Sequence, residues 1–288
     1  MKIVLSAALL VSTLVCAGNI AAAESFEEAL RSKTIEFEAV GDGKYDAKMK
    51  LKLKNRKKTK AKIELEAGRF FYPDDKTIQP FVVYRPALIS MDPEEEKTVW
   101  VFARCGNSGL GGNYLATGFR RTQMGMPELV SILGLMNDLE VSSPQLYQQV
   151  IWHYTNNHKV SAIHCLATSK DTQREIIHAI CSRKGMRIPW YRTYYKPAEN
   201  GNDMEFSGIP DRIEADVELV LSKTSDLQIQ LVDAEGKSVM FVGSLLMQPA
   251  GVRKVPIRID AATLAAGKYT IKVLDQNGSM IDSREIEV

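Results

Sequence analysis

The sequence contains few cysteines and few histidines, with four of each among 288 residues. Four cysteines are too few for a disulfide-dense scaffold, and a hydrophobic content of 45% allows an ordinary packed core instead. The spacing of the histidines fits neither a helical His-x-x-x-His pair nor a zinc finger (His153, His158, His164, His178). We therefore expect no metal site and no cofactor.

Net charge is small too, at +2 over the whole chain. A net charge so close to zero produces no overall positive field that would attract nucleic acid. We therefore do not expect nucleic acid as a partner. The chain also lacks a Gly-x-Ser-x-Gly elbow and a phosphate-binding loop. These absences favour a protein that is not an enzyme.

Long apolar runs are restricted to the start of the chain, where residues 3–15 follow Lys2 and precede three alanines at 21–23. The run is too short to span a bilayer and has the layout of a signal peptide, so we predict cleavage after residue 23 and no transmembrane segment. The mature protein is then exported to the periplasm, the cell surface or the medium. Cys16 leaves with the signal, and three cysteines, an odd number, enter an oxidising compartment.

The mature chain is predicted to be mainly β with a helical subdomain. We expect a signal peptide at 1–23, a β-sandwich with a helical appendage at 24–194, a linker at 195–209 and an immunoglobulin-like β-sandwich at 210–288.

Strands dominate the first half of the amino-terminal unit. Met49, Leu51 and Leu53 alternate with lysines, and a similar alternation at 61–67 predicts that the two runs pair as a hairpin. Short strands at 79–84 and 98–103 extend the sheet, which favours a sandwich. Helical spacing then predicts three helices, at 128–139, 145–155 and 169–183.

One face of the first alternating run is a row of lysines (Lys48, Lys50, Lys52, Lys54). Such a row is a candidate docking patch for a polyanion, such as a surface polysaccharide or an anionic lipid. The alternative is a solvated strand face that prevents edge-to-edge aggregation.

The amino-terminal unit ends a strand in Cys105, and helices and a Gln-x-x-Ile-Trp motif follow, from Gln148 to Trp152. Over residues 35–187 this order resembles secreted bacterial domains of poorly defined function. The Cys and Gln pairing is similar to that of thioester domains in Gram-positive surface adhesins. The resemblance implies that the Cys105 sulfur joins the Gln148 side-chain carbonyl, which releases ammonia. Cys165 and Cys181 then remain as a disulfide candidate; the alternative pairs Cys105 with Cys165.

The carboxyl-terminal unit carries two turn motifs, Asp233-x-x-Gly236 and Leu264-x-x-Gly267-x-Tyr269. Over residues 213–288 they resemble the immunoglobulin-like domains of flagellar hook-capping proteins and the sorting domains of type IX secretion. The resemblance implies a β-sandwich and leaves its role open.

Together these features favour an exported, non-enzymatic binding or surface protein with an unidentified protein or polyanionic partner, and an adhesin-like role. Three alternatives remain open. They are a Cys105–Gln148 thioester adhesin, an enzyme with Cys105 as nucleophile and a nearby histidine, and cargo that carries a type IX sorting domain.

Overall fold

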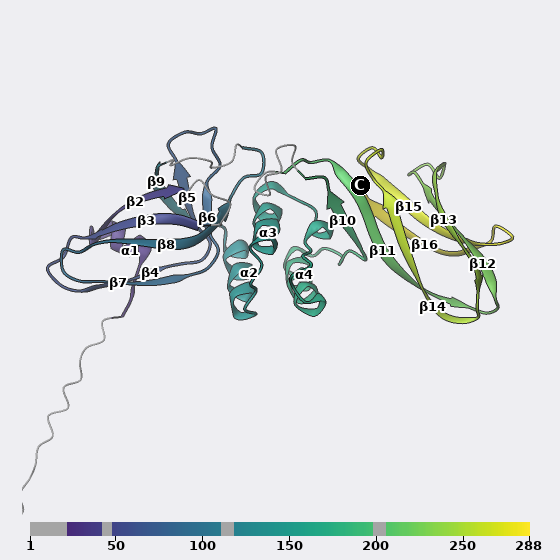
Figure 1. Cartoon of the computed structure of the whole chain (residues 1–288), viewed down its shortest axis with the longest axis horizontal. Helices are drawn as coiled ribbons and strands as arrows, with labels where there is room; N and C mark the ends of the chain where they lie inside the picture. The colour runs from purple at the N-terminus through teal and green to yellow at the C-terminus, as the bar shows by residue number, and fades with distance from the viewer. Residues whose placement is uncertain (1–21, 42–47, 111–117, 198–205) are drawn as a thin grey trace, which may run out of the picture.

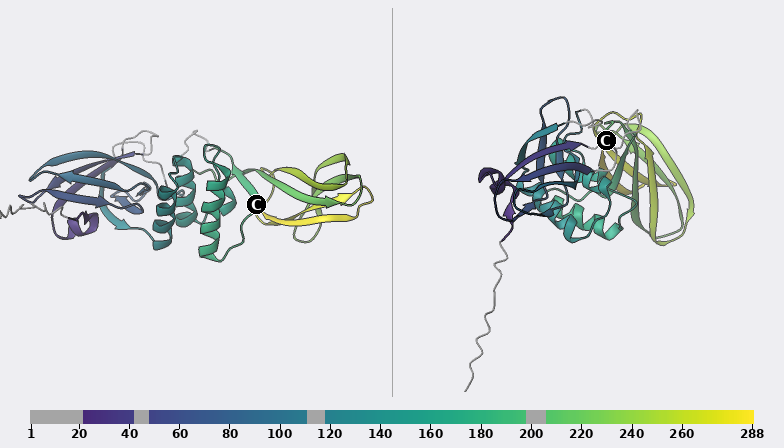
Figure 2. Two further views of the ribbon diagram at one scale, coloured as in Figure 1. Left: turned by 90° about the horizontal axis from the view of Figure 1, so that it is seen from below. Right: turned by 60° about the vertical axis from the view of Figure 1, so that its left-hand side comes forward.

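The computed structural model describes residues 22–41, 48–110, 118–197 and 206–288. Most of the predicted signal peptide therefore lies outside the described residues. The fold is mainly β with four α-helices. A β-barrel, a group of helices and a second β unit follow one another along the long axis of the molecule (Figure 1), and Figure 2 shows the same order from two further directions.

The amino-terminal β unit is a closed barrel with strand order β2-β3-β8-β6-β5-β9. Its strands are β2 (Ile35–Gly41), β3 (Lys48–Asn55), β5 (Arg69–Pro73), β6 (Phe81–Val83), β8 (Glu96–Cys105) and β9 (Gly118–Met124). Pairing of Ala39 with Phe119 closes the ring. The predicted amino-terminal sandwich is thus corrected to a barrel, because alternation specifies which face of a strand is buried but not whether a sheet closes.

Beside the barrel lies a three-stranded sheet of order β1-β4-β7, with β1 (Glu24–Ser25), β4 (Ala61–Leu65) and β7 (Ala87–Met91). The short helix α1 (Phe26–Arg31) follows β1 and has a capping box formed by Ser25 and Glu28. The predicted hairpin is wrong: β3 pairs with β2 and β8, whereas β4 pairs with β1 and β7. Both runs do alternate as expected, and Met49, Leu51 and Leu53 are fully buried in the barrel.

The helices begin and end close to the predicted positions: α2 (Pro127–Asp138), α3 (Pro144–Asn156) and α4 (Lys170–Lys184), with a 3₁₀ turn, η1 (Val160–Ala162). Ser143 and Ser169 cap α3 and α4, and Gly185 ends α4 in a left-handed conformation. Apolar stripes on these helices pack against Phe70, Val82 and other barrel residues in one core. The helical group is therefore attached directly to the outside of the barrel.

The carboxyl-terminal unit contains two sheets that enclose one core, with orders β10-β11-β14 and β13-β12-β15-β16. The strands are β10 (Tyr191–Tyr195), β11 (Pro210–Leu221), β12 (Ser225–Val232), β13 (Ser238–Gln248), β14 (Gly251–Asp260), β15 (Lys268–Asp275) and β16 (Met280–Glu287). The first turn motif is a tight turn in which Gly236 has φ +83° and its N–H donates to the Asp233 carbonyl. Strand β10 pairs with β11, so the carboxyl-terminal sheet begins before the predicted linker.

Across the described ranges, no helix has both the length and the apolar character needed to cross a membrane.

Candidate functional site

Cys105 ends β8 beyond the last described pairing of β8 with β3. On one side of β8, β3 pairs only as far as Lys48, opposite Phe102. On the other side, the Gly106 N–H donates to the Pro80 carbonyl at 2.7 Å. Because hydrogen bonding alternates along an antiparallel strand, the N–H and C=O of Cys105 point away from β6. They face an edge of β8 that no described strand covers.

Gln148, on the second turn of α3, covers this edge. Its Nε2 donates to the Cys105 carbonyl at 2.6 Å, and its Oε1 accepts from the Cys105 N–H at 3.1 Å. Gln148 is 3% exposed and Cys105 is fully buried. The carboxamide takes the place of a neighbouring strand's peptide group, so both backbone groups are satisfied.

Gly106, the first residue after β8, lies in close contact with side chains of the barrel. A Cβ at this position would lie 2.9 Å from Val82 Cγ2, 3.0 Å from Phe70 Cε1 and 3.2 Å from Pro80 Cγ. These neighbours belong to a packed core and have little room to move. Glycine after Cys105 is therefore a packing requirement of the site.

The loop after Gly106 is bound to the end of α3 by side-chain amides. The Ser108 N–H donates to Asn156 Oδ1 at 3.0 Å, and Asn156 Nδ2 donates to Asn107 Oδ1 at 3.0 Å. Asn107 Oδ1 also accepts from the Gly109 N–H at 2.9 Å. The segment that begins at Cys105 is thus held on α3 at two points, Gln148 and Asn156, two helical turns apart.

His158 closes this side of the site as an uncharged group. Its Nε2 lies 2.8 Å from the Ser108 hydroxyl, and its ring lies 3.9 Å from Phe206 and 5.4 Å from Trp152. Burial, with a smaller contribution from nearby His153, lowers the pKa of His158 from 6.5 to about 4. The ring is therefore neutral at ordinary pH and forms one hydrogen bond with the Ser108 hydroxyl.

The histidines have polar contacts of their own. His153 Nδ1 donates to the His158 carbonyl at 2.6 Å, His164 Nε2 lies 3.0 Å from the Thr193 carbonyl, and His178 Nδ1 lies 3.4 Å from the Ser182 hydroxyl. None of these contacts supports a cysteine–histidine dyad. In the part of the chain that the structure describes, no group of three or more histidine, cysteine or acidic residues is arranged to hold a metal ion.

The predicted disulfide between Cys165 and Cys181 is not formed. Gln173, in the first turn of α4, bonds both the N–H and the carbonyl of Cys165, at 3.0 and 2.7 Å. Cys181 lies eight residues further along the same helix, a rise of about 12 Å. A disulfide needs Cα atoms within about 7 Å. Cys165, held at the start of α4, and Cys181, near its end, are therefore separated by most of the length of this helix.

The two thiols have separate contacts. Cys165 Sγ is 3.0 Å from the Ser143 hydroxyl, whereas the Cys181 thiol donates to the Arg187 carbonyl at 3.7 Å. Burial raises the pKa of Cys181, so its thiol stays protonated.

The predicted lysine row does lie on the outward face of β3, and the barrel divides it in two. Lys52 and Lys54 both form ion pairs with Glu96, at 3.6 and 2.8 Å. Lys48 and Lys50 have no ion pair within the described residues, and they stand opposite Phe102 and Trp100 of β8. The positive charge of the row is therefore unbalanced at one end only.

No family model matches the chain, and no curated protein matches it. Among solved structures, two β-glucosidases bound to glucose are similar over most of this chain. The enzyme from Kluyveromyces marxianus is 10% identical with a TM-score of 0.20, and 84% of this chain and 44% of that chain are covered. DesR from Streptomyces venezuelae is 8% identical with a TM-score of 0.20, and 88% and 46% are covered. The chain thus spans less than half the length of these enzymes, and such low scores support no shared fold or activity.

The sequence identified Cys105 and Gln148 but missed the residues around them. Asn156 and Ser108 carried no recognisable signal, because each acts through one amide or one backbone group. The sequence did contain a signal for Trp100 and Phe102. They alternate with Val101 and Ala103, which are buried, so the strand pattern already placed both rings outside.

Proposed function

We propose that this chain is an exported, non-enzymatic binding protein in which Cys105 and Gln148 condense to an internal thioester that captures its target covalently. One observation carries the proposal: the Gln148 carboxamide is held on the backbone of Cys105 by two hydrogen bonds, across 43 residues of sequence. The adhesin-like thioester domains that the sequence resembles need these two residue types in contact.

The chemistry needs no co-reactant. The Cys105 sulfur attacks the Gln148 carboxamide carbon, the C–N bond breaks, and the sulfur-bound proton leaves with nitrogen as ammonia. In the second step, an amine of the target attacks the same carbon. The C–S bond breaks, an amide forms, and the Cys105 thiol is restored with the proton that the amine loses. The energy stored in the thioester drives the capture.

Burial of both residues supports this proposal, because a thioester survives only where water is excluded. Gln148 and Trp152, one helical turn later, are 3% and 5% exposed. Cys105 belongs to the apolar core of the barrel, and the apolar residues of α3 belong to a second core that also includes barrel residues such as Phe70 and Val82. A site of this kind protects an electrophile until a target engages it.

The remaining unit fits an accessory role. We propose that residues 210–288 form an immunoglobulin-like sandwich that spaces the amino-terminal unit from its surroundings, since two sheets there enclose a single apolar core. Such sandwiches serve many functions, so this unit does not define the activity of the chain.

Mass spectrometry of the intact exported protein tests the thioester. We expect the wild-type chain to be lighter than its sequence by one ammonia, to gain one methylamine at Gln148, and to expose an alkylatable thiol at Cys105 after that reaction. Cys105→Ala should have its full sequence mass and take up no methylamine. Gln149→Ala, one residue away, should behave as wild type. A wild-type chain of full mass that takes up no methylamine would overturn the proposal.

A further inference from the structure

The outward face of the barrel carries two large aromatic side chains in the middle of a strand. Trp100 is 55% exposed and Phe102 is 37% exposed, whereas Val101 and Ala103 between and after them are buried in the barrel. The rings stand two residues apart on the same face of β8, about 7 Å along the strand. Adjacent exposed aromatics on a folded protein indicate a contact surface.

Cations surround these rings. Lys50 stands directly opposite Trp100 in the β3–β8 ladder, and Lys48 stands opposite Phe102. The Lys48 Nζ lies 5.9 Å from the centre of the Phe102 ring. The Arg85 guanidinium lies 5.1 Å from the centre of the same ring. Lysine ammonium groups next to aromatic faces are partly held in place by the rings and remain able to meet an anion.

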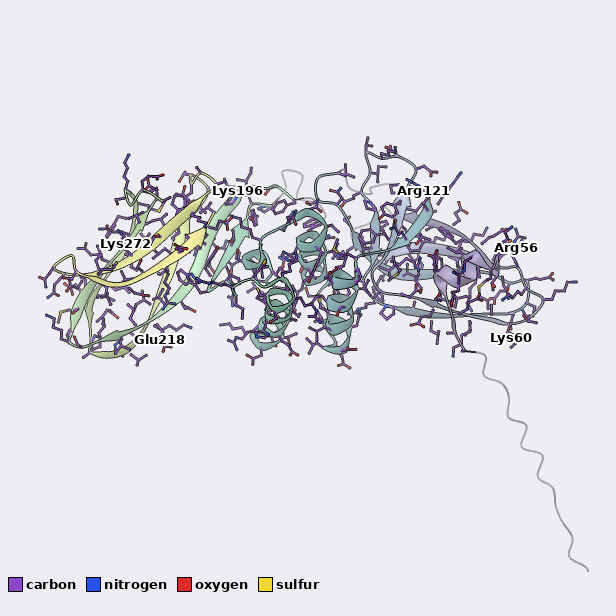
Figure 3. The ribbon with its side chains drawn as sticks, turned by 180° about the vertical axis from the view of Figure 1, so that it is seen from behind. Arg56, Lys60, Arg121, Lys196, Glu218 and Lys272 are labelled. Carbon is purple, nitrogen blue, oxygen red and sulfur yellow. The ribbon has the colours of Figure 1, made fainter. Side chains whose placement is uncertain are left out.

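Several other basic residues of the amino-terminal β unit form ion pairs. Lys52 and Lys54 share Glu96, Arg56 pairs with Glu36, and Lys60 pairs with Asp92 at 3.1 Å. Arg56 and Lys60 lie toward the outer end of the barrel (Figure 3). Among the lysines of β3, the two without an ion pair in the described residues are therefore the two that stand opposite Trp100 and Phe102.

We propose that these four residues (Lys48, Lys50, Trp100, Phe102), the aromatic–lysine platform, bind an acidic polysaccharide that lies along β8. The negative face of an aromatic ring attracts the C–H bonds of a sugar ring, and each lysine meets a carboxylate or sulfate on the same sugar or the next. The platform is separate from the Cys105–Gln148 pair and does not rest on the proposed thioester.

The shape of the platform favours a polysaccharide over a membrane. The rings lie within a strand face and not on a protruding loop, so they do not reach the acyl region of a bilayer. A flexible sugar chain can follow the strand and contact both rings. A neutral sugar chain would use the aromatics alone and leave Lys48 and Lys50 without a partner.

Binding measurements on the full exported protein test this inference. The probes are polygalacturonate, which is carboxylated, dextran sulfate, neutral dextran, and phosphatidylglycerol vesicles. We expect at least one acidic polymer to bind, neutral dextran not to bind, and added salt to weaken binding. Trp100→Ser/Phe102→Ser and Lys48→Gln/Lys50→Gln should each weaken binding roughly tenfold or more.

A matched pair of lysines provides the control. Lys52→Gln/Lys54→Gln removes the same charge from the same strand, and we expect a loss of less than about threefold because Glu96 already neutralises this pair. Cys105→Ala should bind as wild type. All these positions except Cys105 are on the surface, so thermal melting should be unchanged. Equal losses from the two lysine pairs, preference for vesicles, or no binding to either acidic polymer would overturn the inference.

Discussion

Replacement of Gln148 by leucine, in a chain that also carries Cys105→Ala, tests the role of the carboxamide in covering the edge of β8. The alanine removes the sulfur, so no covalent bond contributes, but it leaves the backbone N–H and C=O of residue 105 in place. Leucine has about the volume of glutamine and no polar atoms. The double variant therefore loses both hydrogen bonds, at 3.1 and 2.6 Å, with little change in packing.

The expected loss follows from the burial of the site. Each backbone group left buried without a partner costs about 1 to 3 kcal/mol. Loss of both hydrogen bonds therefore predicts that Gln148→Leu lowers the free energy of unfolding by about 2 to 6 kcal/mol relative to Cys105→Ala alone. Gln149→Leu is the control. Gln149 is half-buried and accepts one bond, from the His164 N–H at 2.9 Å, so its loss should cost about 1 kcal/mol.

Urea unfolding should be followed by hydrogen exchange of peptides from β8 and α3, because a chain with two β units need not unfold in one step. These peptides report on the site without a contribution from the carboxyl-terminal unit. If Gln148→Leu costs no more than Gln149→Leu, the carboxamide does not replace a strand at this edge, and our account of the site is wrong.

Three further predictions concern the same region. His158 is neutral in the fold with a pKa of about 4, against 6.5 when exposed, so its contribution to stability is present above pH 6.5 and lost as the pH falls toward 4. His158→Gln should therefore flatten the dependence of the urea midpoint on pH in this window, and an unchanged slope would contradict the assignment. Gly106→Ala should cost about 1 to 3 kcal/mol in thermal unfolding, whereas Gly109→Ala, whose added Cβ meets only a side-chain atom at 3.4 Å, should cost under about 1. In native protein, iodoacetamide should label Cys165 well before the buried Cys181, and a chain two hydrogens lighter with both unlabelled would show a disulfide that this structure lacks.

The sequence was sufficient for the three larger helices and for the two central residues of the candidate site, Cys105 and Gln148. Helical spacing and capping serines placed α2, α3 and α4 because these signals are local. Alternation placed Leu51 and Leu53 inside the first β unit for the same reason. Cys105 and Gln148 were paired only through a resemblance, and the structure brings the pair into contact.

Pairing between distant strands was not accessible in this way. The residues of β3 that face outward specify no partner, so a hairpin with β4 and a ladder with β8 agree equally with the pattern. Closure of β2 on β9 depends on strand tilt and register, which alternation does not encode. The predicted disulfide is absent from the structure for a different reason. The length of α4 sets the distance between Cys165 and Cys181, and this length cannot be bridged by a disulfide.

The use of a helical side chain to complete the edge of β8 has a consequence for how the chain folds. The N–H and C=O of Cys105, the last residue of β8, form their hydrogen bonds with Gln148 only when α3 has docked. The barrel end and the helices are therefore expected to gain protection from exchange together. A fragment that stops before α3 would lack both of these hydrogen bonds at the end of β8, and exposed strand edges are templates for association with other chains. The barrel and the helical group are thus one cooperative unit, although their secondary structures differ.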